Sequence, residues 1–134
     1  MTSDKMFRAM DISASGLRAE WVRMQVVANN VANAETTQTP EGGPYRRRQV
    51  LFSTVLDGLS GVTVRGVVPS ASAPRMVHNP GHPDANADGL VAMPDISVPL
   101  EMVDMLTAGR AYEANLAAMR KFRQICEEAI KLLR

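Results

Sequence analysis

The residues best suited to chemistry lie in one stretch, Asp-Ala-Asn-Ala-Asp-Gly at 84–89. Oxygen-bearing side chains at alternate positions, followed by a glycine, are typical of the start of a calcium-binding loop, in which Asp95 would be the last ligand. Prolines on both sides exclude the helices that flank such a loop, and an aspartate is shorter than the usual glutamate. The alternative is that these side chains bond to their own backbone and hold a turn. We therefore expect no metal site here.

The two histidines and the single cysteine offer no other site. His78 and His82 would share one face of a helix, but Pro80 and Gly81 break any helix between them. Cys126 excludes an internal disulfide and is expected to be a small buried apolar residue. The sequence has no glycine-rich phosphate loop before a helix and no serine with a plausible base beside it. It therefore predicts no catalysis and no cofactor.

The one basic cluster is Arg46, Arg47 and Arg48. The net charge is only +1, so no strong field attracts nucleic acid or an anionic membrane. So short a cluster is typical of a solvated strand face, and we expect no nucleic-acid partner. No apolar run is long enough to span a bilayer, and no secretory signal peptide is evident. The expectation is a protein that is cytoplasmic or is exported without a cleaved signal.

The elements that position these residues begin with a long amphipathic helix. Apolar residues recur at alternating spacings of four and three from Met10 to Val31, which is the pattern of a helical seam. A seven-residue repeat within it favours left-handed packing against a second long helix. The helix should begin near Asp4 or Phe7 and end near Asn33, where Asn and Thr side chains compete for backbone groups. The main positions of the predicted seam are Met10, Leu17, Trp21, Met24 and Val31, and a second stripe, suited to another partner, consists of Ile12, Ala19, Val22 and Val26.

The segment 98–134 predicts a second long helix. Pro99 in its first turn and Glu101 near the positive end of the helix dipole are both favoured. The helix would be on the order of 50 Å long, which suits a coiled-coil hairpin or an assembly better than a small globule. A close helix crossing would explain Gly109 in its interior. The seam of this helix is predicted to consist of Met105, Tyr112, Leu116, Met119 and Phe122.

The residues between the helices predict a small β-rich insertion that must pack on them to be stable. Strands are expected at 45–52, 61–69 and 75–78, with a short extended piece at 90–93 and a turn at Leu56-Asp57-Gly58. The predicted fold is mainly α, with two long terminal helices packed as a coiled-coil-like antiparallel hairpin around this insertion. The divisions are 1–34 for the first helix, 35–97 for the insertion and 98–134 for the second helix.

Several stretches, in order along the chain, resemble the signature segments of the flagellar axial proteins, and among them the subunits of the proximal rod. They are 10–17 with 28–33, then 39–47, then 79–89 with 91–94, and finally 101–105 with 110–115. The family motif residues in these stretches are Asn29, Asn30, Asn33, Pro80, Gly81, His82, Pro83, Asp84, Asn86, Gly89, Arg110, Tyr112, Glu113 and Asn115. Glu35 and Trp21 depart from the family pattern. One stretch alone would be a weak signal, but their common order is specific.

The resemblance implies a structural, non-enzymatic subunit of the bacterial flagellar rod, the drive shaft that crosses the periplasmic space. It implies polymerisation through the terminal helices, with copies of the chain and other rod proteins as partners. It also implies export by the flagellar type III apparatus without signal cleavage, and no direct membrane span. The alternatives are a calcium-stabilised binding module and a cytoplasmic coiled-coil adaptor.

Overall fold

Two long helices come first and last in the chain, and a β-rich insertion lies between them in the sequence. The computed structural model describes residues 2–54 and 61–132, with side chains from Phe7 onward, so the turn predicted at 56–58 lies outside the described residues. The elements are α1 (Thr2–Ala32), β1 (Arg48–Thr54), β2 (Val62–Pro69), β3 (Arg75–His78), β4 (Leu90–Met93) and α2 (Val98–Leu132). The prediction of two terminal helices separated by a small insertion of strands is confirmed.

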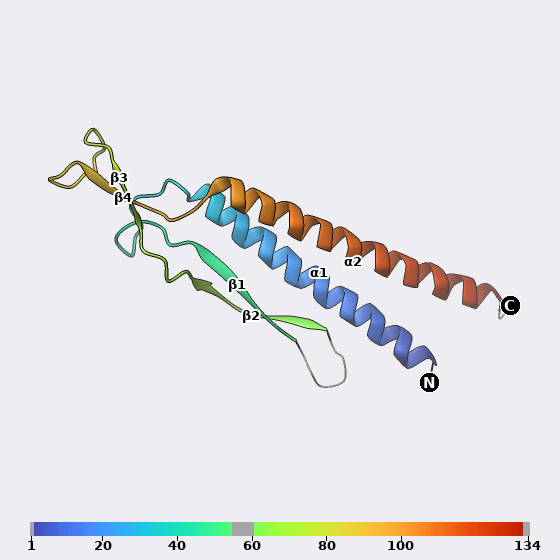
Figure 1. Ribbon diagram of the computed structural model, residues 1–134. Helices are drawn as coiled ribbons and strands as arrows, with labels where there is room; N and C mark the ends of the chain where they lie inside the picture. The colour runs from blue at the N-terminus through green and yellow to red at the C-terminus, as the bar shows by residue number, and fades with distance from the viewer. Residues whose placement is uncertain (1, 55–60, 133–134) are drawn as a thin grey trace.

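Helices α1 and α2 lie side by side and run in opposite directions, so that the end of α1 meets the start of α2 (Figure 1). Asn33 explains where α1 ends, because its side-chain amide donates a hydrogen bond of 2.8 Å to the carbonyl of Asn29. Helix α2 starts where its sequence predicts, with Pro99 in the first turn and the Glu101 amide donating to the Ser97 carbonyl at 3.0 Å. No helix within the described ranges is long and apolar enough to cross a membrane.

The insertion contains two separate two-stranded antiparallel sheets, β1–β2 and β3–β4. In the first, Arg48 lies opposite Pro69 and Thr54 opposite Val62, with a bulge between Leu51 and Phe52. The strand predicted from Tyr45 begins only at Arg48, because the Tyr45 amide donates to the carbonyl of Thr36 in the preceding loop. The strand predicted at 61–69 and the pieces predicted at 75–78 and 90–93 form with bounds within one residue of expectation.

The β1–β2 ribbon lies along one side of α1, and α2 lies along another (Figure 1). The second apolar stripe of α1 faces the ribbon: Ala19 and Val22 line a groove with Val62 and Val64. The end of the predicted seam faces α2, since Val31 shares an apolar groove with residues of its first turns. At these positions the two stripes face different elements. The buried apolar residues of the described chain are small or aliphatic: Ala19, Val26, Val27, Val91, Ile96 and Ala108.

Of the two glycines in the helices, Gly16 lies against the opposite helix and Gly109 does not. A Cβ atom on Gly16 would lie 2.9 Å from Nδ2 of Asn115, which is closer than packed side chains allow. A Cβ atom on Gly109 would meet nothing within 4 Å. The prediction of a close crossing at Gly109 is therefore wrong, because α2 has no neighbouring element that close at this position.

Candidate functional site

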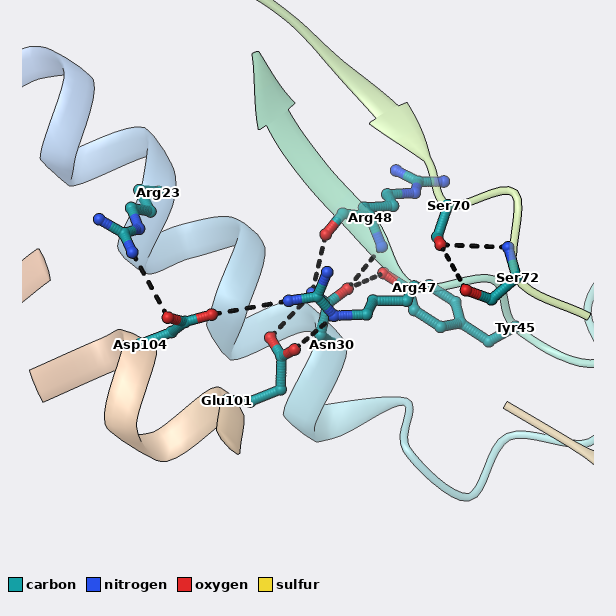
Figure 2. Close-up of polar contacts among 9 residues, drawn as sticks. All are labelled: Arg23, Asn30, Tyr45, Arg47, Arg48, Ser70, Ser72, Glu101 and Asp104. Atoms are coloured by element: carbon teal, nitrogen blue, oxygen red, sulfur yellow. Dashed lines mark hydrogen bonds and ion pairs between the residues drawn. The ribbon is translucent and has the colours of Figure 1, made fainter. Parts of the chain in front are cut away.

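A buried cluster of polar side chains joins the two helices to the insertion at the end of the molecule where α1 stops and α2 starts. Asn30 and Glu101 are each only 1% exposed, although both are polar and one is an acid. Burial of such groups is costly unless every polar atom finds a partner. We call this cluster the polar junction; its members are Arg23, Asn30, Tyr45, Arg47, Glu101 and Asp104 (Figure 2).

Asn30 uses its whole side-chain amide. Nδ2 donates to the Arg48 carbonyl at 2.9 Å and to Oε2 of Glu101 at 3.0 Å. Oδ1 accepts hydrogen bonds from the Arg48 amide at 2.9 Å and from the Tyr45 hydroxyl at 3.2 Å. Two donors and two acceptor sites are the full capacity of a carboxamide. Because the amide pairs with both backbone groups of Arg48, it takes the place of a neighbouring strand and fixes the edge of β1 to α1.

Glu101 is the ionic centre of the junction. Its Oε1 accepts a hydrogen bond of 2.6 Å from Nε of Arg47, while Oε2 accepts the bond from Asn30. Asp104, one turn further along α2, lies 3.6 Å from Nη2 of Arg47 and 3.4 Å from Nη2 of Arg23. The buried carboxylate therefore has a cation and an amide as partners, which is the condition for burying a charge.

Tyr45 closes the junction on its outer side. Burial raises the pKa of its phenol above the ordinary value of 10.0, while the neighbouring Arg48 lowers it and the Glu101 carboxylate raises it further. The raised pKa keeps the hydroxyl protonated, and the protonated form is the one that donates to Asn30.

A second contact fixes the far end of the β1–β2 ribbon to α1. Ser15 is 7% exposed; its hydroxyl donates to the Ile12 carbonyl at 2.7 Å and accepts from the Val62 amide at 3.0 Å. Gly61 precedes this contact with φ of 96°, and a Cβ atom there would overlap the Ser15 hydroxyl. The ribbon is thus held to the helix at both ends, by Asn30 and by Ser15.

The calcium-like stretch belongs to the loop 79–89, called the tip loop below, where Asn86 bonds within the loop and Asp84 also bonds to Thr37 outside it. Oδ1 of Asn86 accepts from the amides of Asp88 and Leu90, each at 2.9 Å. Asp84 accepts a hydrogen bond of 2.7 Å from the Thr37 hydroxyl and lies 3.8 Å from Nδ1 of His82. In the part of the chain that the structure describes, no three His, Cys, Asp or Glu residues gather as metal ligands. The turn-holding alternative describes what Asn86 does.

The remaining motif residues are spread over the molecule. Asn115 lies against Gly16 and donates to the Ala111 carbonyl at 3.0 Å, whereas Asn29, Arg110 and Glu113 are exposed on their helices. Pro80, Gly81 and Pro83 are exposed in the tip loop, Gly89 ends it with φ of 71°, and Asn33 caps α1. The seam residues of both helices are half-buried apart from Trp21, which is 54% exposed.

Most of the polar junction is not evident from the sequence. Arg47 was expected on a solvated strand face, but it points toward the helices and pairs with Glu101, so that expectation is wrong (Figure 2). The sequence explains Glu101 only through the helix dipole and does not indicate its ion pair with Arg47. Strand alternation was the available signal, because it separates Arg47 from Arg46 and Arg48.

Comparison with known proteins places the chain in a class. Residues 10–38 match the family model described as flagella basal body rod protein, and residues 87–132 match that of the flagellar basal body rod FlgEFG protein C-terminal region. These segments contain Asn30 and Glu101 respectively, so the polar junction joins the two matched regions. The chain is thus a flagellar basal-body rod protein.

Relatives that are similar over nearly the full length of the chain identify a single family within this class. The chain is 40% identical to the flagellar basal-body rod protein FlgC of Agrobacterium fabrum, over 98% of this chain and 97% of that protein. It is 35% identical to FlgC of Salmonella typhimurium, over 95% of this chain and 97% of that protein. It is 35% identical to FlgC of Bacillus subtilis, over 94% and 97%. The chain belongs to the FlgC family of flagellar basal-body rod proteins, which are structural subunits that serve flagellar motility.

Proposed function

We propose that this chain polymerises through its terminal helices into the proximal rod, the drive shaft of the flagellum. The observation that supports this most directly is the exposure of large apolar side chains along both helices. Trp21 is 54% exposed, Val103 57%, Leu106 63% and Ile130 65%. Exposed apolar surface of this extent is typical of a protein that is completed by neighbours. Copies of the chain and other rod proteins are the proposed partners.

The half-buried seam supports a coiled-coil-like hairpin as the assembling unit. Met10, Leu17, Met24 and Val31 on α1 and Met105, Tyr112, Leu116, Met119 and Phe122 on α2 are all neither fully buried nor fully exposed. In this proposal residues 1–34 and 98–134 form the assembly core, and residues 35–97 form an insertion that faces neighbouring subunits. The exposed Trp21 then packs against a neighbour and not within the hairpin.

The proposed cellular setting follows from the family. The flagellar type III apparatus exports the chain without cleaving a signal peptide, and the chain takes its place in the part of the rod that crosses the periplasmic space. Its role is structural and not enzymatic, and it requires no cofactor and no nucleic acid.

Purified basal bodies test this proposal. Cells that lack the chain should be non-motile and should lack complete rods by electron microscopy, and expression of the chain should restore both. Peptides of the chain should be present in the purified rods. Recovery of the chain only in the cytoplasm, or motile cells without it, would contradict the proposal and favour the adaptor alternative.

A further inference from the structure

The three consecutive arginines divide between two surfaces. Arg47 is held in the polar junction by Glu101, while Arg46 and Arg48 are exposed and line a groove of about 680 Å³ between the 33–45 segment and the end of β2. We call it the arginine groove; among the residues that line it are Asn33, Thr39, Tyr45, Arg46, Arg48 and Val67. Alternation along an extended chain explains the division, because residues two apart share a face.

The cations of this groove are available and well positioned. Arg48 lies over the Tyr45 ring, with 5.9 Å between the guanidinium carbon and the ring centroid, and its backbone is fixed by Asn30. Neither Arg46 nor Arg48 forms an ion pair within the described ranges. Glu41 is the one acid of the groove lining. A site with two arginines on one face, neighbouring amide and hydroxyl groups and an apolar wall suits a peptide that carries carboxylates.

The chain also has an acidic surface, whose charge is opposite to that of the arginine groove. From residue 76 to residue 109 the sequence contains no Lys or Arg and five acids. Glu101 and Asp104 are used in the polar junction, but Asp84, Asp88 and Asp95 are exposed on and beside the tip loop. Residues 46–75, in contrast, contain five arginines and one acid. The insertion is therefore basic in residues 46–75 and acidic from residue 76 onward.

We propose that the arginine groove binds the acidic tip loop of a second copy of this chain. The bond from Thr37 to Asp84 holds the tip loop of the same chain beside the groove, since Thr36 and Gln38 line it, but no residue of the tip loop itself is in the lining. The groove is thus open to another copy. A contact between two different surfaces of identical chains is heterologous and repeats from copy to copy into a ring or a helical array. The inference rests on the proposed rod function and assigns one lateral contact within it.

Charge reversal tests the contact in cells whose own copy is deleted. The double variant Arg46→Glu/Arg48→Glu should reduce motility and the number of complete rods at least tenfold, and so should Asp88→Arg/Asp95→Arg. Combining both pairs in one chain should restore a large part of the loss, because each reversed groove then meets a reversed loop. Arg65→Glu is the matched control, since Arg65 is an exposed arginine of β2 that does not line the groove.

Circular dichroism of each purified variant shows whether the fold is retained. Normal rods from a folded Arg46→Glu/Arg48→Glu variant would overturn the inference. So would a combined variant no better than either pair alone.

Disulfide trapping identifies the occupant. Two copies, one with Arg48→Cys and one with Asp88→Cys, are co-expressed in a Cys126→Ser background, and rods are purified under oxidising conditions. A covalent dimer of the two variant copies supports the inference. A disulfide to another rod protein, or no disulfide at all, overturns the second copy as occupant. If the unmodified chain is absent from rods, the proposed function itself is wrong. If rods contain the chain but no cross-link forms, only the contact between the groove and the tip loop is wrong.

Discussion

Nδ2 of Asn30 lies 3.0 Å from Oε2 of Glu101, and this single buried hydrogen bond joins the last turn of α1 to the first turn of α2. The same Asn30 side-chain amide forms hydrogen bonds with both the N–H and the C=O of Arg48 at the start of β1. One side chain therefore sets the position of three elements that are far apart in the sequence. The polar junction therefore fixes the start of β1 to both helices.

Replacement of Asn30 by alanine should destabilise the chain by about 3 kcal/mol, because the part-buried backbone groups of Arg48 and one buried oxygen of Glu101 lose their partners. Urea unfolding followed by circular dichroism measures the change. Asn29→Ala is the control, since Asn29 is exposed and its truncation should cost less than about 0.5 kcal/mol. Equal effects of the two substitutions would show that the junction is not a source of stability.

Replacement of Arg47 by methionine should cost about 3–5 kcal/mol, because it leaves the Glu101 carboxylate buried without its cation. Arg65→Met removes an exposed arginine and should change stability by less than about 0.5 kcal/mol. Adding Glu101→Leu to Arg47→Met should recover part of the loss, since the uncompensated charge is then gone. Strictly additive losses in this double-mutant cycle would contradict the pairing.

The stability of the chain should fall at alkaline pH through Tyr45. Its pKa is raised in the folded chain, chiefly by burial, so the folded state holds the phenolic proton more tightly than the unfolded state. This contribution is complete below the unfolded pKa near 10.0 and is lost as pH rises through the higher folded pKa. Tyr45→Phe should therefore flatten the decline above that pH, as measured by unfolding at a series of pH values. An unchanged decline would exclude Tyr45 as its source.

The sequence predicts the elements well because their signals are local. The apolar spacing of α1, Pro99 in the first turn of α2 and the β-branched run of β2 each act within a few residues, and all three elements form. The turn chemistry of Asn86 is local too, and its side chain bonds to its own loop.

The polar junction could not be predicted from such signals, because its contacts cross long sequence separations. The bond from Asn30 to Glu101 spans 71 residues, and the bond from Arg47 to Glu101 spans 54. Strand alternation separates Arg47 from its two identical neighbours, but it does not say which side of the strand faces the helices. The prediction of a close helix crossing at Gly109 is wrong for a related reason. A glycine in a helix indicates a close approach only when the position of the partner helix is known.

The two glycines in the helices should respond differently to replacement by alanine. Gly109→Ala should stabilise the chain by about 1 kcal/mol, because alanine favours the helix and meets nothing within 4 Å. Gly16→Ala should lack this gain, since its Cβ would lie 2.9 Å from Asn115 and force that side chain to move. Adding Asn115→Ala should restore the gain. Thermal unfolding of the three variants checks the order, and equal gains at both glycines would contradict the close approach.

The register of the two helices can be tested at Leu17 and Leu116. Gly16 lies against Asn115, so in antiparallel helices the next residues, Leu17 and Leu116, are offset by only about 3 Å along the axis. We expect the two side chains to share a layer of the seam. Both are half-buried in the single chain, so each truncation to alanine should cost less than the roughly 2–5 kcal/mol of a fully buried leucine.

In the rod, where neighbours complete the burial, the loss should be larger. Leu17→Ala and Leu116→Ala should each block rod assembly and motility while export continues, which is measured by secretion of the variant and by electron microscopy of basal bodies. The double variant should lose less stability than the sum of the single variants, because the second truncation removes a contact that is already broken. Additive losses, or motile cells with normal rods, would mean that these two leucines do not meet and that the helices pack in another register.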